Sequence, residues 1–272
     1  MRVLSLSEEQ ILQYKILQYI DKIAKNEGID YFLAAGSCLG AVRERGFISW
    51  DDDIDIWMKR KDYEKFLAVI DKYHNDLFFV QNCEADNSFF IPGITRICIN
   101  GTDKWGENCK SLSFHKGIYF DIFPLDNVSS CVQMINIKRR LLAMIRVLIG
   151  IKIGGAELVN TRKFFWLIPL ACLLSKNVLL KLYRLIAVTK RDKGFLIYYP
   201  SQYSTERIVF KEKWFEDKIY LQFVDGKYPC ANGYEDILNT MYGADYMTPR
   251  VTKGSIHHAW LVEDEIMERM ND

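Results

Sequence analysis

The chain has 272 residues and a nearly neutral charge, with 36 Lys and Arg against 35 Asp and Glu. Its length allows a sizeable core, and 49% hydrophobic with 26% charged residues excludes a disordered or fibrous protein. The seven cysteines form no C-x-x-C pair and no zinc-finger spacing, so we expect neutral thiols in a reducing compartment. The amino-terminal residues lack the apolar run of a signal peptide, which favours a cytoplasmic protein.

Charge is unevenly distributed along the chain. Residues 138–193 contain 13 Lys and Arg but only two acidic residues, a local net charge of +11. The remainder of the chain therefore carries a net charge of −10. We interpret this pattern as an acidic body with a basic insert.

The first predicted element is an amphipathic helix. Over residues 8–26 apolar side chains recur every three or four positions, which predicts one buried face. Ser7 is the predicted N-cap, because acidic residues follow it, and Gly28 is the predicted stop. A short buried strand over 31–34 is expected next.

The following segment alternates strands with helices. Ser37 is expected to cap a helix that ends near Arg45, and another helix is predicted over about 61–73. The predicted strands are 54–58, 77–81, 94–99 and 118–123. A turn is expected at Pro124. These elements predict a small mixed sheet flanked by helices.

Residues 129–190 change to a helical pattern. Their apolar runs, 141–151 and 164–174, are divided by a Gly-Gly break at 154–155. The elements predicted beyond them are a strand over 219–224 and a helix over 234–242.

We therefore predict an α+β (mixed α/β) protein in three parts. Residues 1–128 form a nucleotidyltransferase-like catalytic core, and residues 129–204 form a basic, mainly helical insert. Residues 205–272 are expected to pack back on the core and complete its site.

The densest chemical signal is the run Asp51-Asp52-Asp53-Ile54-Asp55. Like charges this close raise one another's pKa, and a cation is the usual relief. In a strand Asp53 and Asp55 project from one face, where they can share one Mg²⁺ or Mn²⁺ and leave positions for substrate phosphates. Asp51 and Asp52 lie just before the strand, where they either orient the side chains that bind the metal or cap a turn.

Three other interpretations compete with a cation site. A solvated acidic turn fits the charge, although Trp50 and Trp57 on its flanks indicate partial burial. An EF-hand loop is excluded, because the sixth position from Asp51 is Ile56 and the twelfth is Asp62, where Gly and Glu are needed. A metal-free carboxylate pair of the glycosidase kind needs separated groups, not a dense cluster.

Two further features strengthen the cation-site interpretation. Gly36 and Ser37 lie at a strand-to-helix junction, where backbone N–H groups favour a phosphate. Asp121 lies within an otherwise apolar strand, where burial demands a partner or a metal. Together these residues match a nucleotidyltransferase-type palm, in which metal ions clamp the phosphates during in-line displacement.

The same residues resemble the signature of the LicD family, which includes bacterial phosphorylcholine transferases and is related to the fukutin-type glycan phosphotransferases. Three blocks carry the resemblance: AGSCLGAVR with GFISWDDDID within 35–55, HKG with FDIFPLD within 115–126, and GYEDIL with YGADYM and two histidines within 233–258. Residues 127–204 carry no matching motif. At 243–246 the chain has Gly-Ala-Asp-Tyr where the family more usually has Gly-Asp-Tyr, which leaves the local register open.

The resemblance implies metal-dependent transfer of a substituted phosphate, such as phosphocholine from CDP-choline, to a glycan hydroxyl with release of CMP. Lipopolysaccharide, teichoic acid and capsule are the implied classes of acceptor. By the same resemblance Asp53 and Asp55 bind the cation, and Asp121 completes the metal site or accepts the proton of the acceptor hydroxyl. Gly36 and Ser37 would hold the diphosphate.

Several basic residues within these blocks have open roles. Arg43 either neutralises a phosphate or pairs with an aspartate of the run. Lys116, beside His115, is an equal candidate for a phosphate contact. His257 and His258 ligate a metal, orient the acceptor or are simply exposed.

The headgroup of the donor is also open. A choline group would call for an aromatic cage, and the aromatic residues nearest the motifs are Trp50, Trp57, Trp105 and Tyr119. A ribitol or other polyol phosphate, or an aminoethyl headgroup, is equally compatible with the metal chemistry.

The basic insert suggests peripheral association with the inner membrane surface through 138–193, beside a lipid-linked acceptor. Its apolar run 164–174 is too short to span a bilayer, but aromatic residues with basic flanks are typical of an interfacial helix. A solvated basic subdomain and a channel for an anionic glycan are the alternatives. Nucleic-acid binding is not expected, because the basic residues alternate with aliphatic runs and no recognition motif occurs.

Two other functions remain open. The D-x-D arrangement also allows a true nucleotidyltransferase that releases pyrophosphate. A glycan- or membrane-binding protein that keeps a cation site without turnover is the other.

Overall fold

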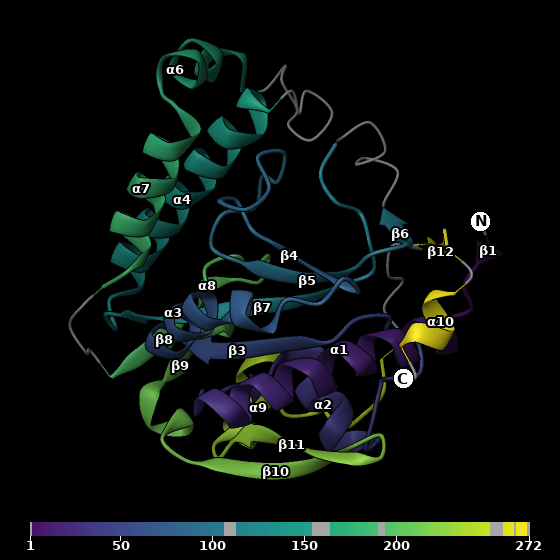
Figure 1. Ribbon diagram of the computed structural model, residues 1–272. Coiled ribbons are helices and arrows are strands. Elements are labelled where there is room, and N and C mark those ends of the chain that lie inside the picture. Colours follow the sequence, from purple (N-terminus) through teal and green to yellow (C-terminus); the bar gives the residue numbers. More distant parts are fainter. Residues whose placement is uncertain are drawn as a thin grey trace.

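The computed structural model describes residues 2–105, 113–153, 164–189, 194–250, 258–263 and 265–270 (Figure 1). Its centre is a mixed sheet with strand order β2-β3-β7-β5-β4, extended from β7 by β8 and β9. β3 and β7 run parallel, and the other pairs are antiparallel. The strands are β2 (Phe32–Leu33), β3 (Asp55–Lys59), β4 (Phe78–Gln81), β5 (Thr95–Ile99), β7 (Tyr119–Val128), β8 (Phe195–Ile197) and β9 (Val209–Lys211). This sheet with its surrounding helices confirms the predicted α+β class.

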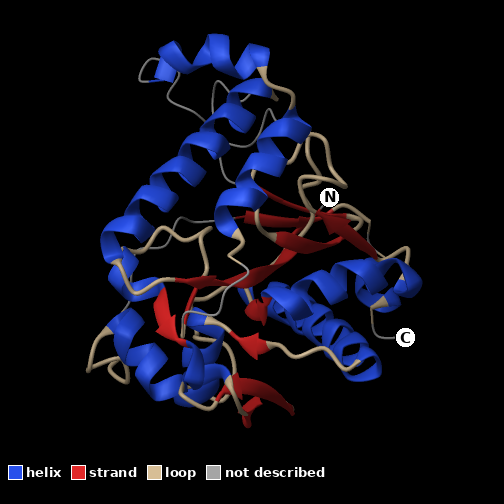
Figure 2. Ribbon diagram, turned by 90° about the vertical axis from the view of Figure 1, so that its left-hand side faces the viewer, coloured by secondary structure: helices blue, strands red, loops and turns tan. Residues whose placement is uncertain are grey.

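Helices lie on both sides of the sheet (Figure 2). The elements on the side of the first helix are α1 (Leu6–Glu27), α2 (Ala35–Arg43), α9 (Tyr234–Tyr242) and the hairpin of β10 (Lys218–Phe223) with β11 (Gly226–Ala231). The N-cap of α1 is Ser5 and not the predicted Ser7, because Ser5 and Glu8 form a capping box. Gly28 ends α1 in the left-handed conformation with φ of 58°, as predicted.

Further helices and a small sheet complete the described body. The helices are α3 (Arg60–Val69), which continues into η1 (Ile70–Tyr73), α8 (Thr205–Ile208), η4 (Glu212–Phe215) and α10 (Ile266–Arg269). The small sheet has the order β1-β12-β6, formed by β1 (Arg2–Val3), β12 (His258–Leu261) and β6 (Thr102–Trp105). It joins the two ends of the described chain next to the start of α1 (Figure 1).

β7 continues straight past the turn predicted at Pro124. On the edge away from β3, β7 pairs with β5 up to Ile122 and with β8 from Asp126 onward, so Pro124 falls between these two partners. The Asp121 N–H points to the carbonyl of Ile54, just before β3. By the two-residue repeat of a strand, the nitrogen of Pro124 faces the other edge of β7. A missing donor there costs no ladder hydrogen bond, which explains why the strand tolerates proline.

A helical hairpin stands away from the sheet on the other side (Figure 1). Its elements are α4 (Val132–Lys152), η3 (Phe165–Leu167), α6 (Ile168–Leu173) and α7 (Lys176–Ala187). The predicted Gly-Gly break at 154–155 lies outside the described residues. In the part of the chain that the structure describes, no helix is long and apolar enough to cross a membrane.

The two faces of β3 belong to different cores. Ile56 and Met58 pack into the core that contains α1, whereas Trp57 packs with Tyr198 and Phe210 in the core beneath the helical hairpin. Because side chains alternate along a strand, Asp55 shares the face of Trp57.

Candidate active site

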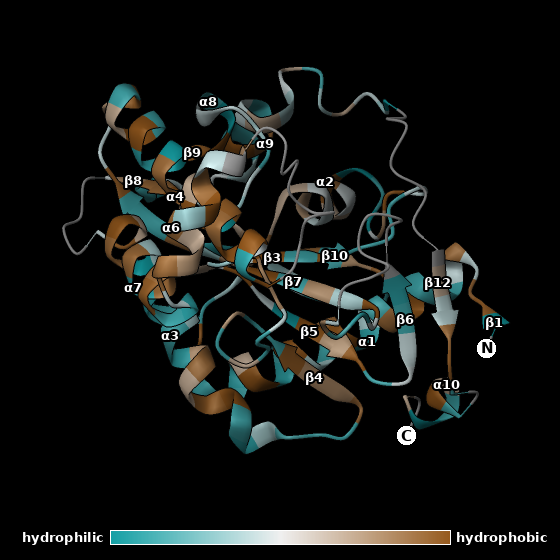
Figure 3. Ribbon diagram, turned by 90° about the horizontal axis from the view of Figure 1, so that it is seen from above, coloured by the Kyte–Doolittle hydropathy of each residue, from teal (hydrophilic) through white to brown (hydrophobic). Residues whose placement is uncertain are grey.

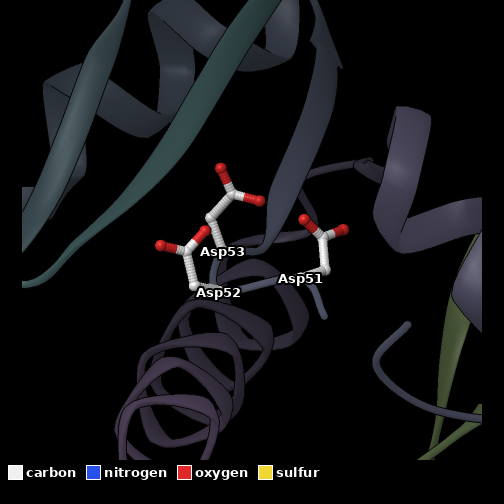
Figure 4. Close-up of side chains that lie close together, drawn as sticks. All are labelled: Asp51, Asp52 and Asp53. Atoms are coloured by element: carbon white, nitrogen blue, oxygen red, sulfur yellow. The ribbon is translucent and has the colours of Figure 1, made fainter. Parts of the chain in front are cut away.

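The aspartate run lies in the segment between α2 and β3. Carboxylate oxygens of Asp51, Asp52 and Asp53 lie within 4.8 Å of one another, and Figure 4 shows the three side chains gathered there. α1 fixes this backbone, because Gln10 donates from Nε2 to the carbonyl oxygen of Asp51 at 2.8 Å. A turn also holds it, since the Asp51 N–H donates to the Ile48 carbonyl at 2.9 Å.

The remaining two acidic residues lie at the adjacent ends of β3 and β7. Asp55 opens β3 and lies opposite Asp121 in the parallel register, and Asp53 lies just before the strand. The fold thus brings the distant Asp121 to the D-x-D pair. Among the described residues, however, the tight group of oxygens belongs to residues 51–53 and does not include Asp55 and Asp121.

Burial and mutual repulsion perturb these carboxyl groups. Burial raises the pKa of Asp51 to about 7, and the charge of Asp53 adds to the effect. Burial also raises the pKa of Asp53 to about 6, and the pKa of Asp55 is raised well above normal by burial, Asp53 and Asp121. Crowded, partly buried oxygens with excess negative charge are suitable ligands for a hard dication, so the residues fit Mg²⁺ or Mn²⁺.

A buried lysine ties the run to α1 and β6. The ammonium group of Lys104 lies 2.5 Å from Glu9 Oε1 and 3.2 Å from both Asp52 Oδ2 and the Asp52 carbonyl oxygen. Burial lowers the pKa of Lys104, but Tyr119 and Glu9 outweigh that effect, so the group is held in its charged form. The sequence pattern gave no sign of this contact, because Glu9 and Lys104 look like ordinary surface charges of a helix and a strand.

Arg96 neutralises Asp121. The two residues are register partners on β5 and β7, and Arg96 donates from Nε to Asp121 Oδ1 at 2.8 Å. Its guanidinium also stacks over the Tyr119 ring at 3.8 Å. The partner that burial of Asp121 demands is therefore present. Arg96 could have been found by the signal that singled out Asp121, since it is a charged residue in an apolar strand.

The Gly-Ser pair has a structural part in assembling the site. A Cβ at Gly36 would lie 2.8 Å from Asp51 Oδ2, so only glycine lets that carboxylate approach the start of α2. Ser37 is buried and accepts a hydrogen bond from the Asp55 N–H at 2.8 Å. It does not cap α2, whose N-cap is Ala34, but ties this helix to β3. Their predicted contact with a diphosphate stays a prediction.

The other predicted side chains lie in different environments. Arg43 pairs with Glu44 at 2.8 Å and not with the aspartate run. The His115 ring contacts Asn100 at 2.8 Å, stacks on Phe79, and has its pKa lowered by burial. Lys116 is half-buried, and its carbonyl accepts from the Lys104 N–H at 2.5 Å. His257 lies outside the described residues, as does the side chain of His258.

A cavity of about 1130 Å³ opens over the carboxylates. Its acidic wall contains Asp51, Asp52, Asp53 and Asp55. Residues from 198–250 also line the cavity, among them Tyr198, Tyr203, Tyr242, Tyr246, Arg207 and Arg250, and α2 contributes Arg43. A cavity of this size accommodates a nucleotide-sized ligand.

The aromatic residues named for a cage are placed differently from one another. Trp57 lines the cavity but is almost wholly buried by Tyr198 and Phe210. The ring of Tyr119 already faces Arg96, and the side chain of Trp105 is not among those described. Trp50 is exposed at the cavity, with Arg43 5.9 Å from its ring centre. The tyrosines opposite the carboxylates were not predicted, because nothing local distinguishes them from core residues.

The chain is similar to proteins that are already known. Residues 28–135 match the family model described as LicD/FKTN/FKRP, nucleotidyltransferase domain. The chain is 26% identical over 266 residues to the lipopolysaccharide cholinephosphotransferase LicD of Haemophilus influenzae, covering 91% of this chain and 93% of that protein. It is also 27% identical over 129 residues to an uncharacterized protein of Rickettsia typhi, covering 44% of this chain and 37% of that protein. These matches confirm the resemblance inferred from the first sequence block.

Proposed function

We propose that this chain, whose residues 28–135 are a LicD-family nucleotidyltransferase domain, is a phosphotransferase that moves phosphocholine from CDP-choline to a hydroxyl of a cell-surface glycan or its precursor. The observation that carries the proposal is the cavity that the carboxylates share with arginine and tyrosine side chains. The similarity to a lipopolysaccharide cholinephosphotransferase over nearly the whole chain supports the same reaction class. Release of CMP and a cytoplasmic location remain part of the proposal.

The carboxylates would hold a divalent cation. Asp51, Asp52 and Asp53 provide oxygens within 4.8 Å of one another, and Asp55 borders the same cavity. Bound there, Mg²⁺ or Mn²⁺ would neutralise phosphate charge and polarise the phosphorus–oxygen bond to the leaving CMP. Lys104 keeps Asp52 in place, so its fixed positive charge orients the run without entering the cavity wall.

The diphosphate would lie between the acidic wall and the arginines. Arg43 and Arg207 line the cavity, and Arg43 is held by Glu44, which fixes the direction of its guanidinium. The nine-residue helix α2 starts at the cavity, where its first N–H groups favour an anion. These groups would bind the phosphates while the acceptor oxygen attacks phosphorus and CMP leaves.

The cholinium headgroup would face the tyrosines. The Tyr203 and Tyr242 rings meet edge to face with their centres 6.3 Å apart, and Tyr198 and Tyr246 line the same wall. Aromatic faces attract a quaternary ammonium through the cation–π interaction, which a neutral ribitol group cannot make. This wall favours choline over a polyol.

Asp121 keeps its two proposed roles. Arg96 occupies its Oδ1 and leaves the other oxygen free to join the cation site or to take the proton of the acceptor hydroxyl. As the base, Asp121 would take the proton of the acceptor hydroxyl while that oxygen bonds to phosphorus and the bond from phosphorus to CMP breaks.

The products decide between this reaction and a true nucleotidyltransferase. The purified chain is incubated with CDP-choline, a glycan acceptor and Mg²⁺, and the released nucleotide is identified by chromatography. We expect CMP and a phosphocholine-modified glycan, both lost in Asp53→Ala and Asp55→Ala. In a second incubation, with CTP and phosphocholine, formation of pyrophosphate would support a nucleotidyltransferase instead. Full activity of both variants would overturn the cation site.

A further inference from the structure

The turn at the far end of the helical hairpin, residues 166–173, exposes a run of apolar side chains; we call it the α6 turn. Its exposed members are Trp166, Ile168, Pro169, Leu170, Cys172 and Leu173. Trp166 is 60% and Leu173 80% exposed, while only Leu167 and Ala171 are buried. Figure 1 shows α6 at the end of the hairpin that is most distant from the sheet.

Such a surface is unusual for a protein that faces only water. Contiguous exposed apolar patches typically mark a contact with another molecule or with a membrane. Figure 3 looks down on the hairpin and shows brown, hydrophobic positions along α6 and α7. A tryptophan among leucines at the edge of a polar body is the composition of an interfacial segment.

The charge around the α6 turn indicates the chemistry of the partner. Lys152 donates from Nζ to the Ala171 carbonyl at 3.1 Å, so a cation lies directly against the turn. The first turn of α7 contains no acidic residue, and the amino-terminal end of that helix adds partial positive charge. The ammonium group of Lys176, which begins α7, is itself bound to the carbonyl oxygens of Asp86 and Asn87, at 3.0 and 2.9 Å. Since residues 138–193 carry a net charge of +11, the fitting partner is both apolar and anionic.

We propose that the α6 turn docks on an anionic lipid surface. Trp166, Leu170 and Leu173 would enter the headgroup boundary, with Lys152 close to the lipid phosphates. The turn is far too short to span the bilayer, so the contact is peripheral and reversible.

Helix α4, which carries Lys152 at the α6 turn, also reaches the candidate site. At the other end of α4, Arg139 donates to the carbonyl oxygens of Ser201 and Tyr203, at 3.2 and 2.6 Å, and both residues line the cavity. Docking through the α6 turn would therefore hold the cavity at a set distance from the lipid surface. A glycan acceptor attached to a lipid could then be presented to it.

The chain offers a closely matched pair of variants. On α6, Leu170 and Leu173 are 37% and 80% exposed. Leu182 and Leu185, with the same spacing, lie in the half of α7 away from the α6 turn and are 38% and 77% exposed. Leu170→Ser/Leu173→Ser removes apolar surface at the turn, and Leu182→Ser/Leu185→Ser removes as much elsewhere on the hairpin. Flotation of the full chain is measured with vesicles of phosphatidylcholine alone and with about one-third phosphatidylglycerol, at low and high salt.

We expect the unmodified chain and the Leu182/Leu185 variant to float with anionic vesicles at low salt. The Leu170/Leu173 variant should lose about tenfold in partitioning, and high salt or neutral vesicles should weaken binding of all three. Quenching of Trp166 by brominated lipids, absent in Trp166→Phe, would place the turn in the bilayer. The proposal would be overturned if the unmodified chain did not float, or if both double variants lost equally. It would also be overturned if light scattering showed a dimer that only Leu170→Ser/Leu173→Ser disrupts. Because flotation needs no turnover, this result is independent of the proposed reaction.

Discussion

Replacing Lys104 by Met tests the buried ion pairs that fix the aspartate run. The Lys104 ammonium lies 2.5 Å from Glu9 and 3.2 Å from Asp52, and the Lys104 and Glu9 side chains are only 2% and 5% exposed. Methionine keeps the length of the side chain but leaves the Glu9 carboxylate buried without its cation. Loss of one partner of a buried pair costs about 3–5 kcal/mol. We expect the lower end of this range, because burial raises the pKa of Glu9 and a proton can replace the missing cation.

Urea unfolding of the chelator-treated protein at pH 7.5 measures this loss. Glu9→Gln/Lys104→Met should recover most of the stability, since the double variant leaves no buried charge at Glu9. The matched control is Arg184→Met, which breaks a 2.6 Å pair with Glu64 whose side chains are 69% and 43% exposed. That change should cost less than about 1 kcal/mol. A Lys104→Met variant as stable as the Arg184→Met control, or no recovery in the double variant, would refute the reasoning.

The remaining predictions concern the carboxylates and the start of α2. Asp51→Asn should raise the melting temperature of the metal-free protein, because it removes a buried charge next to Asp53. The same change should reduce the stabilisation that added Mg²⁺ gives. Thermal unfolding with and without Mg²⁺ measures both effects. The pKa values of Asp51 and Asp53, about 7 and about 6, lie above those of an unfolded chain, so the folded state binds more protons between about pH 4 and pH 7. The metal-free protein should therefore become less stable as pH rises through this window, with a smaller slope in Asp51→Asn/Asp53→Asn; an unchanged slope would contradict the shared-charge explanation. Gly36→Ala should lower the rate of CMP release more than it lowers stability, because the added Cβ would lie 2.8 Å from the Asp51 carboxylate alone. Gly40→Ala should mainly destabilise the protein, because its Cβ would lie 2.3 Å from the backbone oxygen of Gly46. Paired turnover and urea measurements would show whether the two glycines differ in this way.

Features set by neighbouring residues could be predicted from the sequence. The periodicity of α1, the stop at Gly28 and the short apolar strand that becomes β3 depend on a few adjacent positions, and all three are confirmed. The N-cap at Ser7 was wrong although the helix was right, because the capping box favours Ser5. The turn at Pro124 was wrong because the tolerance of a strand for proline depends on which partner lies beside it.

Features set by distant pairings could not be predicted. Asp55 and Asp121 were grouped by their residue types, and the register of β3 with β7 brings them together. The cations that compensate the site, Arg96 and Lys104, reach it through strand pairing and helix packing that leave no local pattern. The three-part division of the chain, the roles of the site residues and the identity of the cation remain predictions.

The residues that line the cavity are widely separated along the chain, and most of them lie within 34–57 and 198–250. Contacts of such long range close large loops and tend to form late in folding. A chain still emerging during synthesis can already have β3 and its aspartates but not the tyrosines, Arg207 and Arg250 that complete the cavity. The ability to bind a donor is therefore gained only once nearly the whole sequence is in place, so that an incomplete chain would have carboxylates without a cavity.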